Sequence, residues 1–181
     1  MNDYVIITER LGLRQWKDED IIPFTAMNKD AEVMRYFPST LTFDETIAMV
    51  NRIHSHFDKH GFGLFSIDDL SAQTFIGYTG FMVPSFTSYF TPCIEIGWRL
   101  KRSSWNKGYA TEAAKACLHY GFETLNFDTI FSFTSELNTK SIKVMQRIGM
   151  KKQGEFDHPN IESSHPLCHH VLYVTEKLKL N

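Results

Sequence analysis

The fold is decided by the stretch Glu95-Ile-Gly-Trp-Arg-Leu-Lys-Arg-Ser-Ser-Trp-Asn-Lys-Gly-Tyr-Ala-Thr-Glu112. Its first part is typical of a strand, a turn containing Gly108 follows, and a helix is expected to begin near Tyr109. A strand that turns into a helix leaves several backbone N–H groups without partners at the positive end of the helix dipole. This arrangement predicts a binding site for a phosphate-like anion.

The common nucleotide-binding motifs do not account for this anion site. The stretch lacks the pattern Gly-x-x-x-x-Gly-Lys-Ser/Thr, and neither Gly61-Phe-Gly63 nor Gly77-Tyr-Thr-Gly80 forms a dinucleotide fingerprint. The anion therefore belongs to another class of ligand.

On both sides of this stretch, the hydrophobic pattern predicts further strands and helices. Thr42-Phe-Asp-Glu45 has capping-box spacing and opens a helix that stops at Gly61, and a second helix runs from Tyr109 to Leu125. The other expected elements are a strand over Val5–Leu13, one or two short helices over Lys17–Tyr36, an antiparallel meander of strands over Phe62–Asp68, Thr74–Val83 and Cys93–Leu100, a strand over Thr129–Thr134, a helix over Thr139–Ile148, and strands near Met150–Gln153 and His170–Glu176.

This order of elements predicts a mixed sheet with helices on its faces, and a purely parallel sheet does not fit it. No repeat, low-complexity block or linker interrupts the chain, so residues 1–181 are expected to form one domain.

The composition indicates a globular protein without surplus positive charge. The 181 residues are 43% hydrophobic and 22% charged, with a formal net charge of -2. Such a composition argues against a disordered chain or a coiled-coil rod. Because no basic surplus is available to neutralise phosphates, neither nucleic acid nor a membrane is expected as a partner.

The cysteines Cys93, Cys117 and Cys168 are odd in number and far apart, so neither a disulfide framework nor a thiolate zinc site is expected. The N-terminus lacks the pattern of a signal peptide, and no apolar run is long enough to span a bilayer. We therefore expect a cytoplasmic protein.

Four motifs follow one another in the chain: Glu95-Ile-Gly-Trp-Arg-Leu, Trp105-Asn-Lys-Gly-Tyr-Ala-Thr-Glu-Ala113, Asn138-x-x-Ser141 and Val144-Met-x-Arg-Ile-Gly-Met150. In this order and spacing they resemble the GNAT N-acetyltransferases, in their RimJ/RimL-like branch. The resemblance implies an α/β fold with a mixed, mostly antiparallel central sheet of six or seven strands. It also implies helices on both faces and two splayed parallel strands at the centre.

The resemblance further implies a site for acetyl-CoA as co-substrate. The pyrophosphate would lie on the main-chain amides of Asn106, Lys107, Gly108, Tyr109, Ala110 and Thr111, because helix-start amides bind phosphate. The pantetheine arm would follow the main chain of Trp98, Arg99 and Leu100, with Asn138 on its other side. Trp105 and Asn106 stand where the family commonly has Gln or Arg and then Gly, so backbone contacts to phosphate are expected in place of side-chain contacts.

For the chemistry, Glu95 resembles the glutamate that this branch carries as a base acting through water. The alternative is a strand carboxylate that pairs with Arg99 or is solvated. Met145 replaces the family's tyrosine acid, which leaves Ser141 to donate a proton or hydrogen bond to the sulfur. The alternatives are a Ser141 hydroxyl that bonds its own helix, and a thiolate that leaves without an acid.

Four histidines lie in the tail. A metal site is not expected, because the adjacent His169 and His170 of a strand point to opposite faces. His158 and His169 are candidates to contact the acceptor or assist as a base, and the alternative is a structural role. The loop from Ser85 to Thr91 is interpreted as a lid or an interface patch.

Together these features indicate an N-acetyltransferase that moves the acetyl group of acetyl-CoA to a primary amine, on a peptide N-terminus or a small molecule, by direct attack in a ternary complex. The competing interpretation is a non-catalytic acyl-CoA-binding or regulatory domain. A resistance enzyme that modifies an amino sugar would share the chemistry and differ in its acceptor. Both a monomer and a homodimer are compatible with the sequence.

Overall fold

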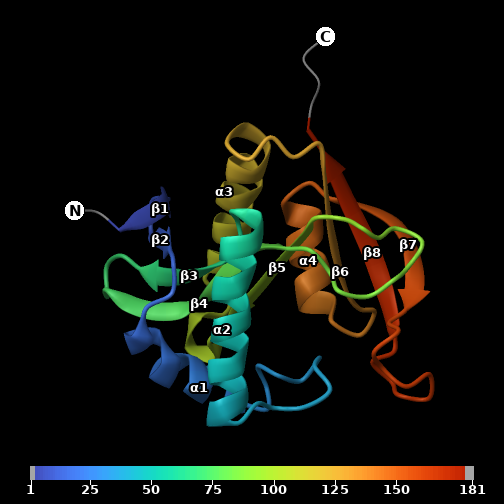
Figure 1. The fold of residues 1–181 in the computed structure, drawn as a ribbon, viewed down its shortest axis with the longest axis horizontal. Helices are drawn as coiled ribbons and strands as arrows, with labels where there is room; N and C mark the ends of the chain where they lie inside the picture. The colour runs from blue at the N-terminus through green and yellow to red at the C-terminus, as the bar shows by residue number, and fades with distance from the viewer. Residues whose placement is uncertain (1–2, 178–181) are drawn as a thin grey trace.

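One twisted sheet runs through the computed structural model, which describes residues 3–177 (Figure 1). Within these residues it has eight strands in the order β1-β2-β3-β4-β5-β6-β8-β7. The strands are β1 (Tyr4–Ile7), β2 (Leu11–Arg14), β3 (Leu64–Asp69), β4 (Thr74–Met82), β5 (Glu95–Leu100), β6 (Thr129–Ser135), β7 (Lys151–Asp157) and β8 (His169–Glu176). Neighbouring strands are antiparallel, except that β5 and β6 are parallel. The mixed, mostly antiparallel sheet is therefore confirmed.

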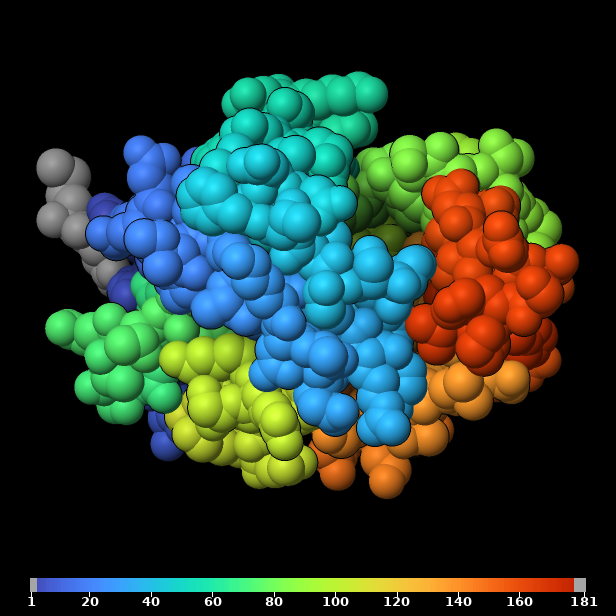
Figure 2. All heavy atoms as spheres, turned by 90° about the horizontal axis from the view of Figure 1, so that it is seen from below, coloured from blue at the N-terminus to red at the C-terminus, as the bar shows by residue number. Residues whose placement is uncertain are grey.

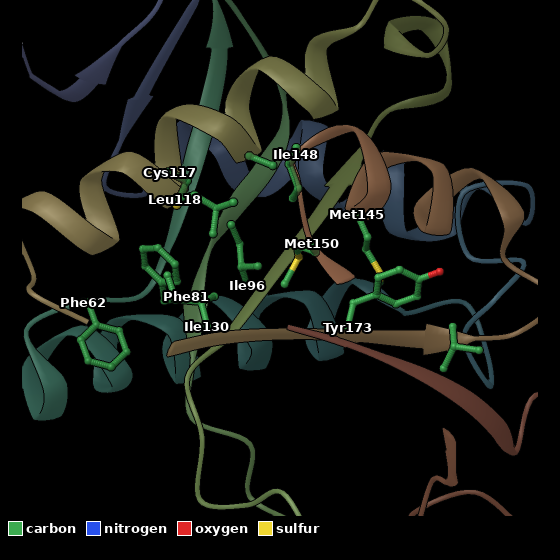
Figure 3. Close-up of a cluster of buried hydrophobic side chains, with 12 residues drawn as sticks. Phe62, Phe81, Ile96, Cys117, Leu118, Ile130, Met145, Ile148, Met150 and Tyr173 are labelled. Carbon is green, nitrogen blue, oxygen red and sulfur yellow. The ribbon is translucent and has the colours of Figure 1, made fainter. Parts of the chain in front are cut away.

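Helices cover both faces of this sheet. They are α1 (Ile21–Lys29), α2 (Phe43–His60), α3 (Tyr109–Glu123) and α4 (Thr139–Arg147), with 3-10 turns η1 (Asp18–Asp20) and η2 (Arg102–Ser104). On one face, Phe24 of α1 and Ile53 of α2 pack against Tyr78 of β4. On the other face, Cys117 of α3, Met145 of α4 and Ile96 of β5 belong to one buried cluster, and Figure 3 shows Met145 beside the ring of Tyr173.

The capping box predicted for α2 is present. The Thr42 backbone N–H donates to the Glu45 carboxylate over 2.7 Å, and the Glu45 N–H donates to the Thr42 hydroxyl over 3.2 Å. The helix ends at Gly61, whose φ of 76° is left-handed and suits glycine. Here local sequence chemistry alone fixes both ends of an element.

Two expectations about the N-terminal part are corrected. The segment predicted as one strand over Val5–Leu13 is a hairpin, because the Thr8 hydroxyl accepts a hydrogen bond from the Leu11 N–H (2.9 Å) and turns the chain. This extra strand raises the sheet from the expected six or seven strands to eight. The helix expected to continue to Tyr36 ends at Lys29, and turns follow it.

The parallel strands β5 and β6 separate soon after they meet, as the resemblance implied. The Phe131 N–H donates to the Ile94 carbonyl over 2.8 Å, and next along, the Ser132 hydroxyl donates to the Ile96 carbonyl over 2.9 Å. A side-chain hydroxyl thus replaces the next backbone hydrogen bond of the ladder. By strand alternation, the main chain of Trp98 faces the gap that opens beyond this point.

Candidate functional site

A cavity of about 810 Å³ occupies the gap between the splayed strands. It is lined by the ends of β5 and β6, by the starts of α3 and α4, by residues 32–38 between α1 and α2, and by residues 158–161 before β8. Figure 2 looks at this end of the molecule, where residues 31–42 (blue) lie between the turn into α3 (yellow-green) and the loop before β8 (red). The cavity therefore lies between the strands that carry the sequence motifs and two connecting segments, residues 32–38 and 158–161, that lie outside the motifs.

The turn into α3 has the geometry of an anion site. Asn106 and Gly108 both have left-handed φ angles, 61° and 82°, and Gly108 is the N-cap residue of the helix without a side-chain hydrogen bond. Because the first amides of a helix have no intrahelical acceptor, those of Tyr109, Ala110 and Thr111 are available to a ligand. Lys107 belongs to the same turn but does not line the cavity.

A polar network outside the motifs holds this turn in place. Arg10 donates to the Lys107 carbonyl over 3.0 Å and pairs with the carboxylate of Glu112 in the first turn of α3. The Thr8 hydroxyl donates to the same carboxylate over 2.6 Å. No sequence motif predicts these contacts, because Arg10 and Glu112 are 102 residues apart.

The aromatic residues of this region are tied to the main chain. The Trp105 indole N–H donates to the Leu100 carbonyl over 2.9 Å, and the Lys140 ammonium lies 4.2 Å from the centre of the Trp105 ring. Trp105 and Trp98 both line the cavity. Lys140 thereby brings a positive charge from α4 to the side of the cavity that the α3 amides face.

Glu95 lies on the cavity wall without an ion-pair or hydrogen-bond partner among residues 3–177. The expected alternative, a pair with Arg99, is not formed, because the Arg99 guanidinium instead donates to the Asn28 amide oxygen over 2.7 Å. Burial raises the pKa of the Glu95 carboxyl to about 8. A carboxyl with this pKa exchanges its proton near neutral pH, as a general base must.

Asn138 and Ser141 come together at the start of α4, on the cavity wall. The Asn138 side chain caps the helix by accepting from the Ser141 N–H over 3.3 Å, and it donates to the Thr134 hydroxyl over 3.0 Å. The Ser141 hydroxyl makes no hydrogen bond in the described part of the chain, so the backbone-bonded alternative is not realised. Met145 is buried in the core and offers no acid.

The structure separates the histidines of the tail. His158 lines the cavity, but His169 does not: its ring nitrogens lie 3.0 Å from Asp157 and 3.2 Å from Glu155 on the exposed side of the sheet. The structure therefore does not bring His169 together with the other predicted site residues at the cavity. Strand alternation turns the neighbouring His170 into the cavity instead.

His158 and His170 are held within an aromatic cluster, with their ring centres 5.0 Å apart. Burial lowers the pKa of both imidazoles, which keeps them neutral near pH 7. The loop between β4 and β5 closes over this cluster, where Phe86 lies 4.8 Å from His158 and Phe90 lies 4.8 Å from Phe156, centre to centre. These two rings of the loop are packed and do not form an exposed patch.

The described residues contain neither a cluster suited to a metal ion nor a helix suited to a membrane. Over residues 3–177, no group of three or more His, Cys, Asp or Glu side chains is placed to hold a metal ion. Within the same residues, none of the helices has the length and apolar character needed to cross a membrane. The cysteines Cys93, Cys117 and Cys168 are free and buried.

Comparison with known proteins gives consistent matches over most of the chain. Residues 10–151 match the acetyltransferase (GNAT) domain. An uncharacterized N-acetyltransferase of Bacillus subtilis, YnaD, is 33% identical over 153 residues, which cover 83% of this chain and 85% of that protein. The spermidine N(1)-acetyltransferase of Escherichia coli is 26% identical over 155 residues, covering 81% and 75% of the two chains.

The fold also matches solved structures. The crystal structure of a GNAT-family acetyltransferase from Bacillus anthracis superimposes with a TM-score of 0.79 at 28% sequence identity. The match covers 95% of this chain and 98% of that one.

Proposed function

The chain belongs to the GNAT acetyltransferase family and is an acyltransferase, and from this premise we propose that it transfers the acetyl group of acetyl-CoA to a primary amine by direct attack. The observation that carries the proposal is the position of Glu95. Its carboxyl has no counter-charge among residues 3–177, lies at the gap between β5 and β6, and has a pKa raised by burial to about 8. A group of this kind is suited to accept a proton from an incoming ammonium.

The acetyl-CoA site is proposed to use the main chain on both sides of the gap. The amides from Asn106 to Thr111 would bind the pyrophosphate, and among them Lys107 would contribute only through its main chain at the edge of the turn. The main chain of Trp98, Arg99 and Leu100 would lie along the pantetheine arm, and Asn138 would lie on its other side. The left-handed turn at Gly108 and the charge of Lys140 beside Trp105 fit this assignment.

In the proposed reaction, the acceptor enters as an ammonium and loses one proton to Glu95, directly or through one water. The nitrogen then attacks the thioester carbonyl, so that a C–N bond forms and the C–S bond breaks. The leaving sulfur takes a proton from the Ser141 hydroxyl, which is the proposed relay: it takes up in turn the second proton that the attacking nitrogen releases, so that the products are the N-acetylated amine and the free CoA thiol. The proposed reaction has no covalent enzyme intermediate. Burial raises the pKa of Cys93 to about 12 and also raises the pKa of Cys117, so both thiols stay protonated and are poor nucleophiles.

Several finer assignments belong to the same proposal. We assign the chain to the RimJ/RimL-like branch, acting in the cytoplasm as a monomer or homodimer, with His158 at the acceptor and without nucleic acid or metal. The four motifs support the branch, and the free, buried cysteines support a reducing compartment.

The test is to titrate the purified protein with acetyl-CoA in a calorimeter and to measure thiol release with a panel of primary amines. The proposal expects saturable binding and amine-dependent release of free CoA thiol. Binding without release on any amine would favour the competing interpretation, a non-catalytic acyl-CoA-binding domain. The absence of any binding heat would overturn both interpretations.

The turn at Gly108 gives a prediction with a matched control. Gly108→Ala is expected to weaken acetyl-CoA binding by ~10-fold, because a φ of 82° is unfavourable for alanine and the amides would turn away from the ligand. Gly61→Ala carries the same backbone strain, at a φ of 76°, at the end of α2 and outside the cavity. Calorimetry should find wild-type affinity in the Gly61 variant. Equal losses in both variants would show a general loss of stability and contradict the assignment.

A further inference from the structure

Arg99 is a buried cation that has no anionic partner in the described part of the chain. Its side chain projects from β5 toward α1 and is 8% exposed. One guanidinium nitrogen donates to the Asn28 amide oxygen, the Nε atom has no hydrogen-bond partner, and no carboxylate lies within 4.0 Å among residues 3–177. The Phe37 ring lies 3.9 Å from the guanidinium carbon and the Tyr78 ring 5.4 Å from it. Arg99 and both rings line the cavity.

The other buried arginine of the described chain shows what such a group ordinarily needs. Arg14 is 5% exposed and donates to two carboxylates, those of Asp20 and Asp68, at distances from 2.7 to 3.0 Å. A buried charge is costly unless it is paired. Since residues 3–177 supply no anion to Arg99, we expect the missing partner to come from a ligand in the cavity.

Arg99 lies at a definite distance from the reacting centre. Glu95, Gly97 and Arg99 share one face of β5, with Glu95 and Arg99 about 13 Å apart at their Cα atoms for a strand of ordinary rise. Gly97 lies between them and has no side chain, so this face of β5 forms an open floor of the cavity. A Cβ at Gly97 would meet only the Glu95 carboxylate, at 3.9 Å. A ligand lying along this floor would place one end at Glu95 and the other at Arg99.

We infer that the acceptor of this enzyme carries a carboxylate, which Arg99 binds while the amine lies at Glu95. The inference rests on the proposed acetyl transfer and names its substrate class: amines with a carboxylate several bonds away from the nitrogen, as in ω-amino acids and short peptides. A polyamine would bring a second positive charge to the guanidinium and be repelled. The relative from Escherichia coli is named for spermidine, and we expect this chain to differ from it.

The test compares acceptors that are alike except at the end away from the amine: aminocaproate, its carboxamide, n-hexylamine and hexamethylenediamine. The wild-type kcat/KM is expected to be at least ~10-fold higher for aminocaproate than for n-hexylamine, and lowest for the diamine. Arg99→Gln should remove most of this preference. A preference that is absent in the wild type, or unchanged in the variant, would overturn the inference while leaving acetyl transfer intact.

A second variant tests the inference independently, in case Arg99→Gln does not fold. Asn28→Asp is isosteric and places a carboxylate on the same guanidinium nitrogen. It should compete with the carboxylate of the acceptor and lower the preference without removing Arg99. Melting temperatures of both variants measure their folding.

A binding readout separates this inference from the proposed function. Calorimetric titration of aminocaproate into the protein saturated with CoA should give heat for the wild type and at least ~10-fold weaker binding for Asn28→Asp. This result does not depend on turnover. Absence of aminocaproate binding to the wild type would overturn the inference. It would also be overturned if Arg99→Gln lost acetyl-CoA affinity as strongly as it lost aminocaproate affinity, because Arg99 would then serve the cofactor.

Discussion

Glu95→Gln is expected to lower turnover by ~10²-fold or more and to leave acetyl-CoA affinity nearly unchanged. Glutamine keeps the size and the polar character of the side chain but cannot accept the proton of an ammonium. The carboxyl has no partner in the described chain, so its replacement breaks no hydrogen bond or ion pair of the fold. Thiol release under saturating acetyl-CoA measures the first effect, and calorimetry measures the second.

The pH dependence of the wild type and of Glu95→Gln tests more sharply whether Glu95 is the general base. Burial raises the pKa of Glu95 to about 8, so the carboxyl is protonated below that pH and ionised above it. Since only the ionised form accepts a proton, wild-type kcat/KM should rise with pH and level off above about 8. The Glu95→Gln profile should lose this rise and keep only the titration of the acceptor amine. Two profiles of the same shape would remove Glu95 from the mechanism.

The second large effect concerns stability. Arg14→Met is expected to lower the free energy of unfolding by about 3–5 kcal/mol, because the carboxylates of Asp20 and Asp68 would remain buried without a cation. The hydrogen bonds to Asp20, together with those to Asp68, raise the pKa of Arg14, so the wild-type cation persists across the accessible pH range. Urea unfolding at neutral pH measures the loss.

Arg10→Met serves as the matched control for this prediction. Arg10 also pairs with a carboxylate, that of Glu112, but its side chain is 42% exposed. An exposed pair contributes about 1 kcal/mol or less. Similar losses for the two variants would contradict the argument from burial. The variant Arg14→Met with Asp20→Asn and Asp68→Asn should recover part of the stability, because the uncompensated charges are then gone.

The sequence predicts the parts of the fold that local chemistry determines. The capping box at Thr42 and the glycine at Gly61 bound α2, and a short polar turn over residues 70–73 joins β3 to β4. The hairpin between β1 and β2 was missed because its turn, Thr8-Glu-Arg10, contains no glycine or proline. The contacts that hold it come from Glu112, more than a hundred residues away in sequence.

The candidate site likewise contains residues that sequence motifs predict and residues that only the fold brings together. The motifs predict Glu95 and the amides of the α3 turn, which lie in one continuous segment. They cannot predict that Arg99 meets Asn28, 71 residues earlier, or that residues 32–38 form a wall of the cavity. For the tail, alternation correctly places His169 and His170 on opposite faces. Only the packing of β8 between β6 and β7 decides that His170 is the one that faces inward.

The burial of Cys93, Cys117 and Cys168 has a practical consequence. Thiol-reactive dyes added to the folded protein should react slowly with these side chains, so a colour change during catalysis reports the liberated coenzyme with little background. The same dyes would label the chain quickly once it denatures. One reagent can thus follow both the reaction and the integrity of the catalyst in a single cuvette.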